Sequence, residues 1–229
     1  MAKRLTEIDA LRGLAVCTMV IYHLAFQGVM LGVFTLDLRS AAWVALARFT
    51  QFLFLPIVGV SIFFSGRDLV EQLRRSAVIF LGGMLMTLGT YFFIPHAFVR
   101  FGVLHFIAFA IPIVYLFKNH PRWALFAAAV AFSVGRFFSG LWVENEWLFW
   151  LGLNYKEYQA LDHFPIFPWL AAPLVGLAIG HCFYAKRKPT ALACFGKIRP
   201  LVWIGRHALL IYIIHHPIIF AGVSLLAQL

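Results

Sequence analysis

Long apolar runs alternate with short polar segments along the whole chain. Each run approaches the roughly 20 apolar residues that a helix needs to cross a bilayer. The pattern predicts seven membrane-spanning helices, at about residues 11–33, 43–64, 76–94, 101–117, 123–141, 166–184 and 207–228. We therefore predict an all-α, polytopic transmembrane helical bundle, formed by a single integral membrane domain over residues 1–229.

The distribution of Lys and Arg predicts the orientation, because basic residues concentrate in cytoplasmic segments. With the N-terminus in the cytoplasm, 14 of them fall in inner segments and 3 in outer segments. An odd number of spans then places the C-terminus outside. The outer segment 142–165 is rich in Trp and Tyr and is predicted to be a partly helical flap at the membrane surface. The inner segment 185–206 is predicted to be a basic loop that Pro189 and Pro200 break.

Composition supports a membrane protein, since 62% of the residues are hydrophobic and 12% are charged. Soluble domains are roughly half apolar and a quarter charged. The net charge of +10 could suggest nucleic acid, but the basic residues are scattered between apolar runs. We therefore expect no nucleic-acid partner, and assign these residues to orientation and to contacts with anionic membrane lipids or a phosphorylated ligand. The three cysteines form no paired motif, which predicts neither a disulfide nor a metal site.

The first apolar run carries polar residues at its start and in its middle, in the stretch RLTEIDALRGLAVCTMVIYH. Arg12 and His23 are eleven residues apart, so they share a helix face about 16 Å apart along the axis. Asp9 lies close to the same stripe. Ionisable groups within a membrane mark functional sites by default, and His23 could act as a general base or a transient acyl acceptor. Alternatively, His23 bonds a neighbouring helix, Arg12 only sets orientation, and Asp9 only caps the helix.

Further polar residues lie at predicted span ends. Arg100 and His105, in FVRFGVLHFIA, could form an outer polar pocket, although Arg100 could simply snorkel to the interface. Asp162, in LDHFPIFPWL, could orient a histidine or bind an acceptor hydroxyl or amine, and ordinary helix capping is an equal alternative.

The last span contains two adjacent histidines, His215 and His216, followed by Pro217. Adjacent side chains on a helix point about 100° apart, so we expect the two not to face the same neighbour. They are candidates for binding substrate. Alternatively, one of them satisfies the backbone carbonyl that Pro217 leaves without a donor.

These motifs together carry a resemblance to a known family. The stretches EIDALRGLAVCTMVIYH, FLPIVGVSIFFSG, FVRFGVLHFIA, LDHFPIFPWLA and GRHALLIYIIHHPI resemble the small bacterial members of the heparan-α-glucosaminide N-acetyltransferase catalytic-domain family. The resemblance runs from about Glu7 to Pro217. The spacing of Arg12 and His23 is also similar to the first-span motif of the acyltransferase type 3 family.

The resemblance implies an acyl-CoA-dependent transmembrane acyltransferase of the bacterial cytoplasmic (inner) membrane. Acetyl-CoA or another acyl-CoA would dock from the cytoplasm, and the acyl group would pass to a glycan or amino-sugar acceptor. His23 and Asp9 would then be catalytic, and Arg12 would bind the CoA. The outer mouth and the path to it would include substrate-binding residues, namely Arg100, His105, Asp162, His215 and His216. A homo-oligomer is left open.

The chain departs from the lysosomal-type members at one position. In those members an asparagine matches His23 and the working histidine follows in the first outer loop, whereas the loop FTLDLRSAA has no histidine here. A catalytic role for His23 therefore rests on the similarity to the type 3 motif. The chain is also shorter than those members, so heparan sulfate is not implied as its acceptor.

Two other functions fit the residues. A small-molecule transporter or flippase would also carry buried Arg and His along its pathway, but would favour an internal repeat, which the sequence lacks. A seven-span receptor or structural subunit would pair its polar residues in a closed bundle. A CoA-binding site would favour the acyltransferase over both.

Overall fold

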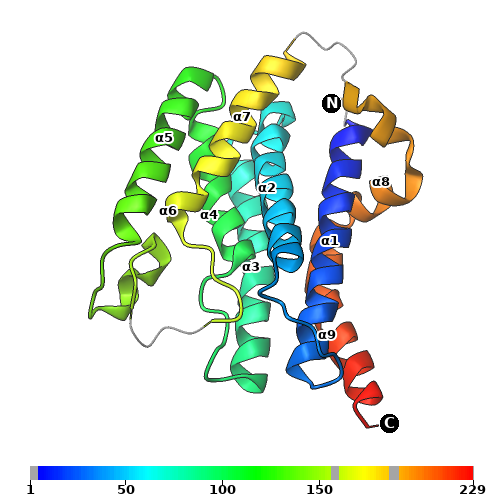
Figure 1. Ribbon diagram of the computed structural model, residues 1–229. Coiled ribbons are helices and arrows are strands. Elements are labelled where there is room, and N and C mark those ends of the chain that lie inside the picture. The colour runs from blue at the N-terminus through cyan, green and yellow to red at the C-terminus, as the bar shows by residue number, and fades with distance from the viewer. Residues whose placement is uncertain (1–4, 156–159, 186–190, 229) are drawn as a thin grey trace. The chain divides into compact units, whose positions relative to one another are not determined.

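The computed structural model describes residues 5–155, 160–185 and 191–228, and most of these residues are helical (Figure 1). The elements, with η denoting a 3-10 helix, are α1 (Thr6–Met30), α2 (Ala41–Phe64), α3 (Leu69–Phe93), α4 (Val103–Leu116), α5 (Pro121–Phe138), η1 (Glu146–Leu151), α6 (Ile166–Trp169), α7 (Ala171–Tyr184), η2 (Ala191–Lys197), α8 (Arg199–Arg206) and α9 (Ala208–Leu226). Strand pairing in the described part is limited to two isolated bridges. The predicted all-α class is confirmed.

Five helical segments of the described chain are long and apolar enough to cross a membrane: α1, α2, α3, the α6–α7 segment and α9. The shorter α4 is also apolar, but has only 14 residues. Helices occupy all seven of the predicted runs, and the polytopic membrane bundle is confirmed. The count of seven spans and the orientation stay predictions.

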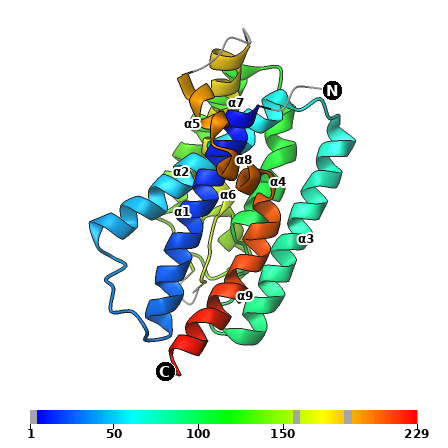
Figure 2. The same ribbon diagram turned by 90° about the vertical axis from the view of Figure 1, so that its right-hand side faces the viewer.

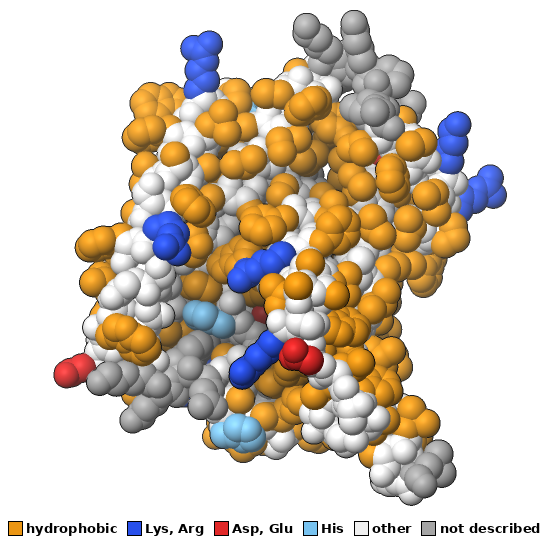
Figure 3. Space-filling view, in the orientation of Figure 1, with side chains coloured by type: hydrophobic (Ala, Val, Ile, Leu, Met, Phe, Trp, Pro, Cys, Tyr) orange, Lys and Arg blue, Asp and Glu red, His pale blue; other side chains and the backbone are white. Residues whose placement is uncertain are grey.

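The surface suits a lipid environment. Hydrophobic side chains cover most of the face in Figure 3. Phe92 and Phe93, at the end of α3, expose 76% and 79% of their surface. Contiguous exposed apolar surface of this kind is uncommon on soluble monomers and is typical of membrane contact.

The helices form two compact units. The central unit holds the described residues of Leu55–Lys188, and the terminal unit holds those of Arg4–Phe54 and Pro189–Leu229, so α2 contributes to both. In the central unit α3 packs on α4, and α5 packs on α6 and α7. An added Cβ on Gly59 would overlap the carbonyl oxygen of Pro173, so this glycine permits close contact between the second half of α2 and α7. The prediction of one domain over residues 1–229 stays a prediction.

In the terminal unit α1 packs against α8, η2 and α9. Figures 1 and 2 show α8 beside the N-terminal half of α1, and α9 beside its C-terminal half. Through α1, the terminal unit thus joins described residues 5–54 to described residues 191–228. This packing positions the candidate site described below.

Prolines and polar caps account for several helix boundaries. The first turn of α3 has a capping box, in which the Asp68 carboxylate accepts from the Glu71 N–H and the Glu71 carboxylate accepts from the Asp68 N–H. Pro200 lies in the first turn of α8, where a missing N–H is tolerated. The prediction of a loop over residues 185–206 is therefore wrong, because η2 and α8 occupy most of its described residues and Pro200 lies at the start of α8. Pro189 lies outside the described residues. In the part of the outer segment that the structure describes lies a short 3-10 helix, η1.

Candidate functional site

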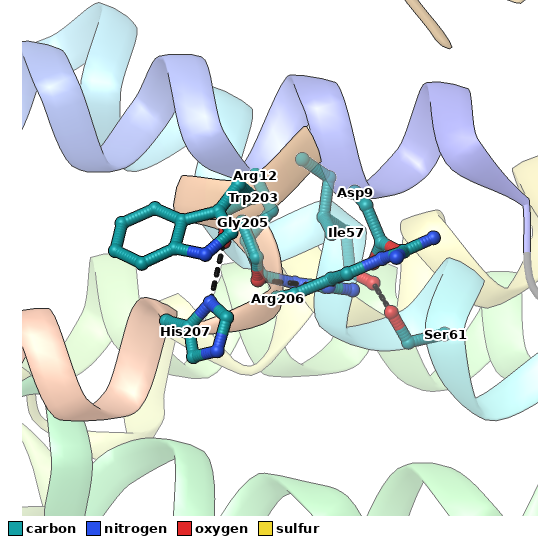
Figure 4. Close-up of polar contacts among 8 residues, drawn as sticks. All are labelled: Asp9, Arg12, Ile57, Ser61, Trp203, Gly205, Arg206 and His207. Atoms are coloured by element: carbon teal, nitrogen blue, oxygen red, sulfur yellow. Dashed lines mark hydrogen bonds and ion pairs between the residues drawn. The ribbon is translucent and has the colours of Figure 1, made fainter. Parts of the chain in front are cut away.

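The terminal unit contains a buried carboxylate that two arginines share. Asp9, in the first turns of α1, is 2% exposed. Arg12 Nη1 donates a hydrogen bond to Asp9 Oδ1 at 2.8 Å, and Arg206 Nε, at the end of α8, lies 3.4 Å from Asp9 Oδ2 (Figure 4). We call Asp9, Arg12 and Arg206 the arginine cluster. Two guanidinium groups thus converge on one carboxylate, and guanidinium groups are suited to binding a phosphate-bearing ligand.

Two glycines make the arginine cluster possible. A Cβ on Gly205 would overlap the carbonyl oxygen of Asp9, and a Cβ on Gly13 would overlap that of Leu201. The backbones of α1 and α8 therefore meet directly, as small residues allow in membrane helices. Arg12 Nη1 also lies 3.4 Å from the Gly205 carbonyl oxygen. This approach places Arg206 beside Asp9, about two hundred residues earlier in the chain.

Farther along α1 the terminal unit contains a second polar group, which we call the histidine cluster: His23, Gln27, His215 and His216. His23 Nδ1 lies 2.8 Å from His215 Nε2, and Gln27 Nε2 lies 2.7 Å from His216 Nδ1. The ring of His23 also lies 4.4 Å from that of His216, centroid to centroid. Both histidines therefore face the same helix, α1, and the expectation that they face different neighbours is wrong. One turn of α1 offers two polar positions, four residues apart, and the adjacent histidines of α9 each meet one.

His215 also bonds its own helix. Its Nδ1 lies 2.7 Å from the carbonyl oxygen of Tyr212 and 3.1 Å from that of Ile211. The carbonyl that Pro217 leaves without a donor belongs to Ile213, four residues before it. His215 therefore does not compensate for the proline.

The three histidines offer ring nitrogens within 4.8 Å of one another, a spacing at which side chains can hold a metal ion. A tetrahedral zinc site with Zn–N bonds of about 2.0–2.1 Å separates its nitrogens by about 3.3 Å. The 2.8 Å between His23 and His215 is shorter than this and equals a hydrogen-bond distance. The expectation of no metal site stays a prediction.

The predicted outer residues of the central unit gather around the start of α4. Asp162 Oδ2 accepts a hydrogen bond from the Val103 N–H at 2.9 Å. His105 Nδ1 accepts one from the Gly102 N–H at 3.3 Å, and its Nε2 lies 3.4 Å from Thr87 Oγ1. Both side chains therefore satisfy backbone donors that a helix N-terminus leaves without partners. Their role in binding substrate stays a prediction.

Arg100 forms an ion pair with Glu146 of η1, with Arg100 Nη1 3.1 Å from Glu146 Oε2. Both side chains are well exposed, so the pair contributes little to stability. His163 lies beside this region, with its ring 6.1 Å from that of Phe149. Burial lowers the pKa of His163 to about 4, because the protonated ring is poorly solvated there.

Sequence reasoning identified Asp9, Arg12 and His23 but did not select Arg206 or Gln27 as site residues. Arg206 is one of the 14 basic residues that the orientation rule assigns to inner segments, and it lies in the stretch GRHALLIYIIHHPI. Gln27 follows His23 by four residues, so helical spacing placed it on the same face. A polar amide one turn from a mid-span histidine was the available signal for it.

The fold and these clusters define a polytopic helical membrane protein whose first helix takes part in two polar clusters. The family model for "Heparan-alpha-glucosaminide N-acetyltransferase, catalytic" matches residues 4–217. The chain belongs to this family, as the motifs of the sequence indicated. Membership implies a transferase, in general terms an acetyltransferase. No curated protein and no solved structure matches the chain.

Proposed function

We propose that the chain is a membrane-embedded acyltransferase that moves an acetyl group from cytoplasmic acetyl-CoA to an amino-sugar or other cell-envelope acceptor, in the bacterial cytoplasmic membrane. One observation carries the proposal. The arginine cluster and the histidine cluster both lie on α1, and Arg12 and His23 are eleven residues, about 16 Å, apart along its axis. This arrangement can hold an anionic donor at one end of a span and a proton acceptor within it.

The arginine cluster is the proposed donor site. CoA carries phosphates, and a guanidinium can bind a phosphate through two parallel hydrogen bonds. Arg206 is about half exposed, so its side chain can reach a ligand while Asp9 holds its Nε. Asp9 is buried, and it would orient both arginines rather than contact the donor. The predicted orientation places this end of α1 at the cytoplasm, where CoA is found.

His23 is the proposed base or acyl carrier. As a base, its ring nitrogen takes the proton of the acceptor amine while the amine nitrogen attacks the acetyl carbonyl carbon. The carbon–sulfur bond of the thioester breaks, and CoA leaves as a thiolate that takes up the proton from His23. As an acyl carrier, His23 attacks the carbonyl first and then passes the acetyl group to the amine. Both routes require an unprotonated nitrogen on His23.

Calorimetry on the purified, reconstituted full chain tests the proposal, with acetyl-CoA as the ligand and glucosamine as the probe acceptor. The parent should bind acetyl-CoA, and Arg12→Ala should weaken binding about 10- to 100-fold, the loss expected for a charged hydrogen bond. His23→Ala should bind normally but lower transfer about 100-fold or more. His120→Ala, at an exposed histidine before α5, is the matched control and should change neither.

Absence of acetyl-CoA binding to a well-folded parent would refute the donor site and favour the transporter alternative. Normal transfer by His23→Ala would refute the catalytic role while leaving the donor site intact. The two parts of the proposal therefore fail separately.

A further inference from the structure

The chemistry proposed for His23 depends on which of its ring nitrogens bears the hydrogen. A neutral imidazole has one N–H donor and one nitrogen with a lone pair, and its hydrogen-bond partners decide between them. His23 contacts the side chain of His215, which in turn contacts backbone carbonyls. Because these carbonyl oxygens can only accept hydrogen bonds, the ring hydrogens of His215 and then of His23 can be assigned in turn.

A backbone carbonyl can only accept a hydrogen bond. His215 Nδ1 lies 2.7 Å from the Tyr212 carbonyl oxygen and 3.1 Å from that of Ile211, so Nδ1 must carry the hydrogen. In the neutral ring Nε2 of His215 is then an acceptor. His215 is also 5% exposed, so its orientation is held by packing as well as by these contacts.

His23 Nδ1 lies 2.8 Å from this acceptor, and must therefore donate to it. The remaining nitrogen, His23 Nε2, keeps its lone pair. Among the residues that the structure describes, no hydrogen bond occupies this nitrogen. It is the atom that can take a proton or attack a carbonyl carbon.

We propose that His215 is a positioning residue that holds His23 in the tautomer with a reactive Nε2. Two hydrogen bonds do this: His215 Nδ1–H donates to the Tyr212 carbonyl oxygen, and His23 Nδ1–H donates to His215 Nε2. The catalytic part of this inference rests on the proposed function. When His23 takes a proton at Nε2, its Nδ1–H bond to His215 strengthens, because a charged donor makes a stronger hydrogen bond. His215 thus plays the part that a carboxylate plays beside the histidine of a serine hydrolase.

A neutral partner suits this depth in a membrane. A carboxylate would be costly to keep ionised within an apolar span, whereas an imidazole that bonds its own helix adds no charge. His216 does not replace His215 in this role, because its Nδ1 is engaged by the Gln27 amide. The inference thus assigns His215 a part in the reaction that differs from binding substrate.

Nitrogen-15 NMR of histidine-labelled full chain in lipid nanodiscs reads the tautomer directly. The His23 signals are assigned from their absence in His23→Gln. We expect His23 to be protonated at Nδ1 in the parent, and to shift to the Nε2–H form or a mixture in His215→Phe. His215→Gln supplies an amide oxygen that can accept from His23 Nδ1–H, so the parent tautomer should be kept. His120→Gln serves as the labelled control and should leave the His23 signals unchanged.

Kinetics with acetyl-CoA and glucosamine give a second readout. His215→Phe should lower kcat about 100-fold with KM changed less than about twofold, and His215→Gln should recover most of kcat. A raised KM at normal kcat in His215→Phe would instead show that His215 binds substrate, and would overturn the inference. Unaltered His23 signals in His215→Phe would also overturn it, whatever the activity.

Metal analysis completes the test. Zinc bound at one ion per chain and lost in His215→Phe would overturn the inference, since the ion would occupy the lone pairs that the chain of hydrogen bonds requires. The proposed function fails in a different way. Suppose that the parent has the expected tautomer, that His215→Phe loses it, and that the parent does not bind acetyl-CoA. The hydrogen bond between His23 and His215 is then supported, and the acyltransferase function is refuted.

Discussion

The two units use similar residues for different purposes. Asp9 and His215 are buried in the terminal unit. In the central unit His105 is buried and Asp162 is half-buried. Asp9 and His23 bond side chains that other helices supply. Asp162 and His105 instead bond the backbone N–H groups of Val103 and Gly102 at the start of α4.

The type of partner separates the two roles. The first N–H groups of a helix have no partner within it, so a carboxylate or imidazole that accepts from them completes the secondary structure. His105 is satisfied on both nitrogens, since Thr87 lies beside its Nε2. His23 keeps an unshared lone pair on Nε2, and Arg206 of the arginine cluster is about half exposed, where a ligand can reach it. We infer that surplus hydrogen-bonding capacity, rather than burial of a polar residue, distinguishes a reactive site from a structural one.

The largest expected effect comes from separating α1 from α8. Gly205→Ala places a methyl group against the carbonyl oxygen of Asp9, which should lower stability by about 1–3 kcal/mol. It should also weaken acetyl-CoA binding more than tenfold, because Arg206 moves away from Asp9 and the contact of Arg12 with the Gly205 carbonyl oxygen is disturbed as well. Thermal unfolding and calorimetry measure the two effects. The control is Gly222→Ala in α9, where the added methyl group meets no atom within 4 Å. Equal behaviour of the two variants would contradict the close packing of α1 on α8.

The next effect concerns the charge of the arginine cluster. Arg206→Ala should weaken acetyl-CoA binding about tenfold, less than Arg12→Ala, because Arg206 is the more exposed and more strongly screened of the two. Raising the ionic strength should weaken binding to the parent more than to the variant. Titrations at two salt concentrations provide the measurement. Arg136→Ala, at an exposed arginine of α5, should leave affinity and salt dependence unchanged.

A smaller effect tests the structural side of the comparison. Asp162→Ala removes the acceptor for the Val103 N–H and should lower stability by about 1 kcal/mol, as loss of a helix cap does. Asp162→Asn keeps an oxygen acceptor and should lower it less. If capping is the role of Asp162, KM for the acceptor stays normal in the folded fraction. A raised KM without a change in unfolding temperature would restore the predicted substrate-binding role.

The smallest effect is the pH dependence of the central unit. Burial lowers the pKa of His163 to about 4, whereas an unfolded histidine titrates near 6.5. The unfolded chain binds the proton more tightly, so the stability that His163 contributes is complete above about pH 6.5 and is lost as the pH falls towards 4. Unfolding temperatures at pH 7 and pH 5 should therefore differ, and His163→Phe should reduce the difference. An unchanged difference would mean that other groups cause it.

The sequence by itself determined the helical membrane fold, two of the three residues of the arginine cluster and three of the four residues of the histidine cluster. Apolar runs predict spans because the free-energy cost of placing polar residues in lipid depends only on the residues of the segment itself. Helical spacing alone put Asp9, Arg12 and His23 on one face of one helix. The family motifs added the expected activity, which the match over residues 4–217 supports in its general form.

Only the tertiary structure supplied the partners. His23 and His215 are 192 residues apart, and Asp9 and Arg206 are 197 apart, and no periodicity links such positions. Adjacent side chains on a helix point in different directions, which suggested that His215 and His216 face different helices. The spacing within α9 could not show that α1 offers both of them a polar residue, His23 and Gln27, one turn apart. The hydropathy of a segment can be read from its own residues. Hydrogen bonds between helices depend instead on which helix faces the packing brings together. That is the reason the tautomer of His23 can be inferred from the fold and not from its sequence.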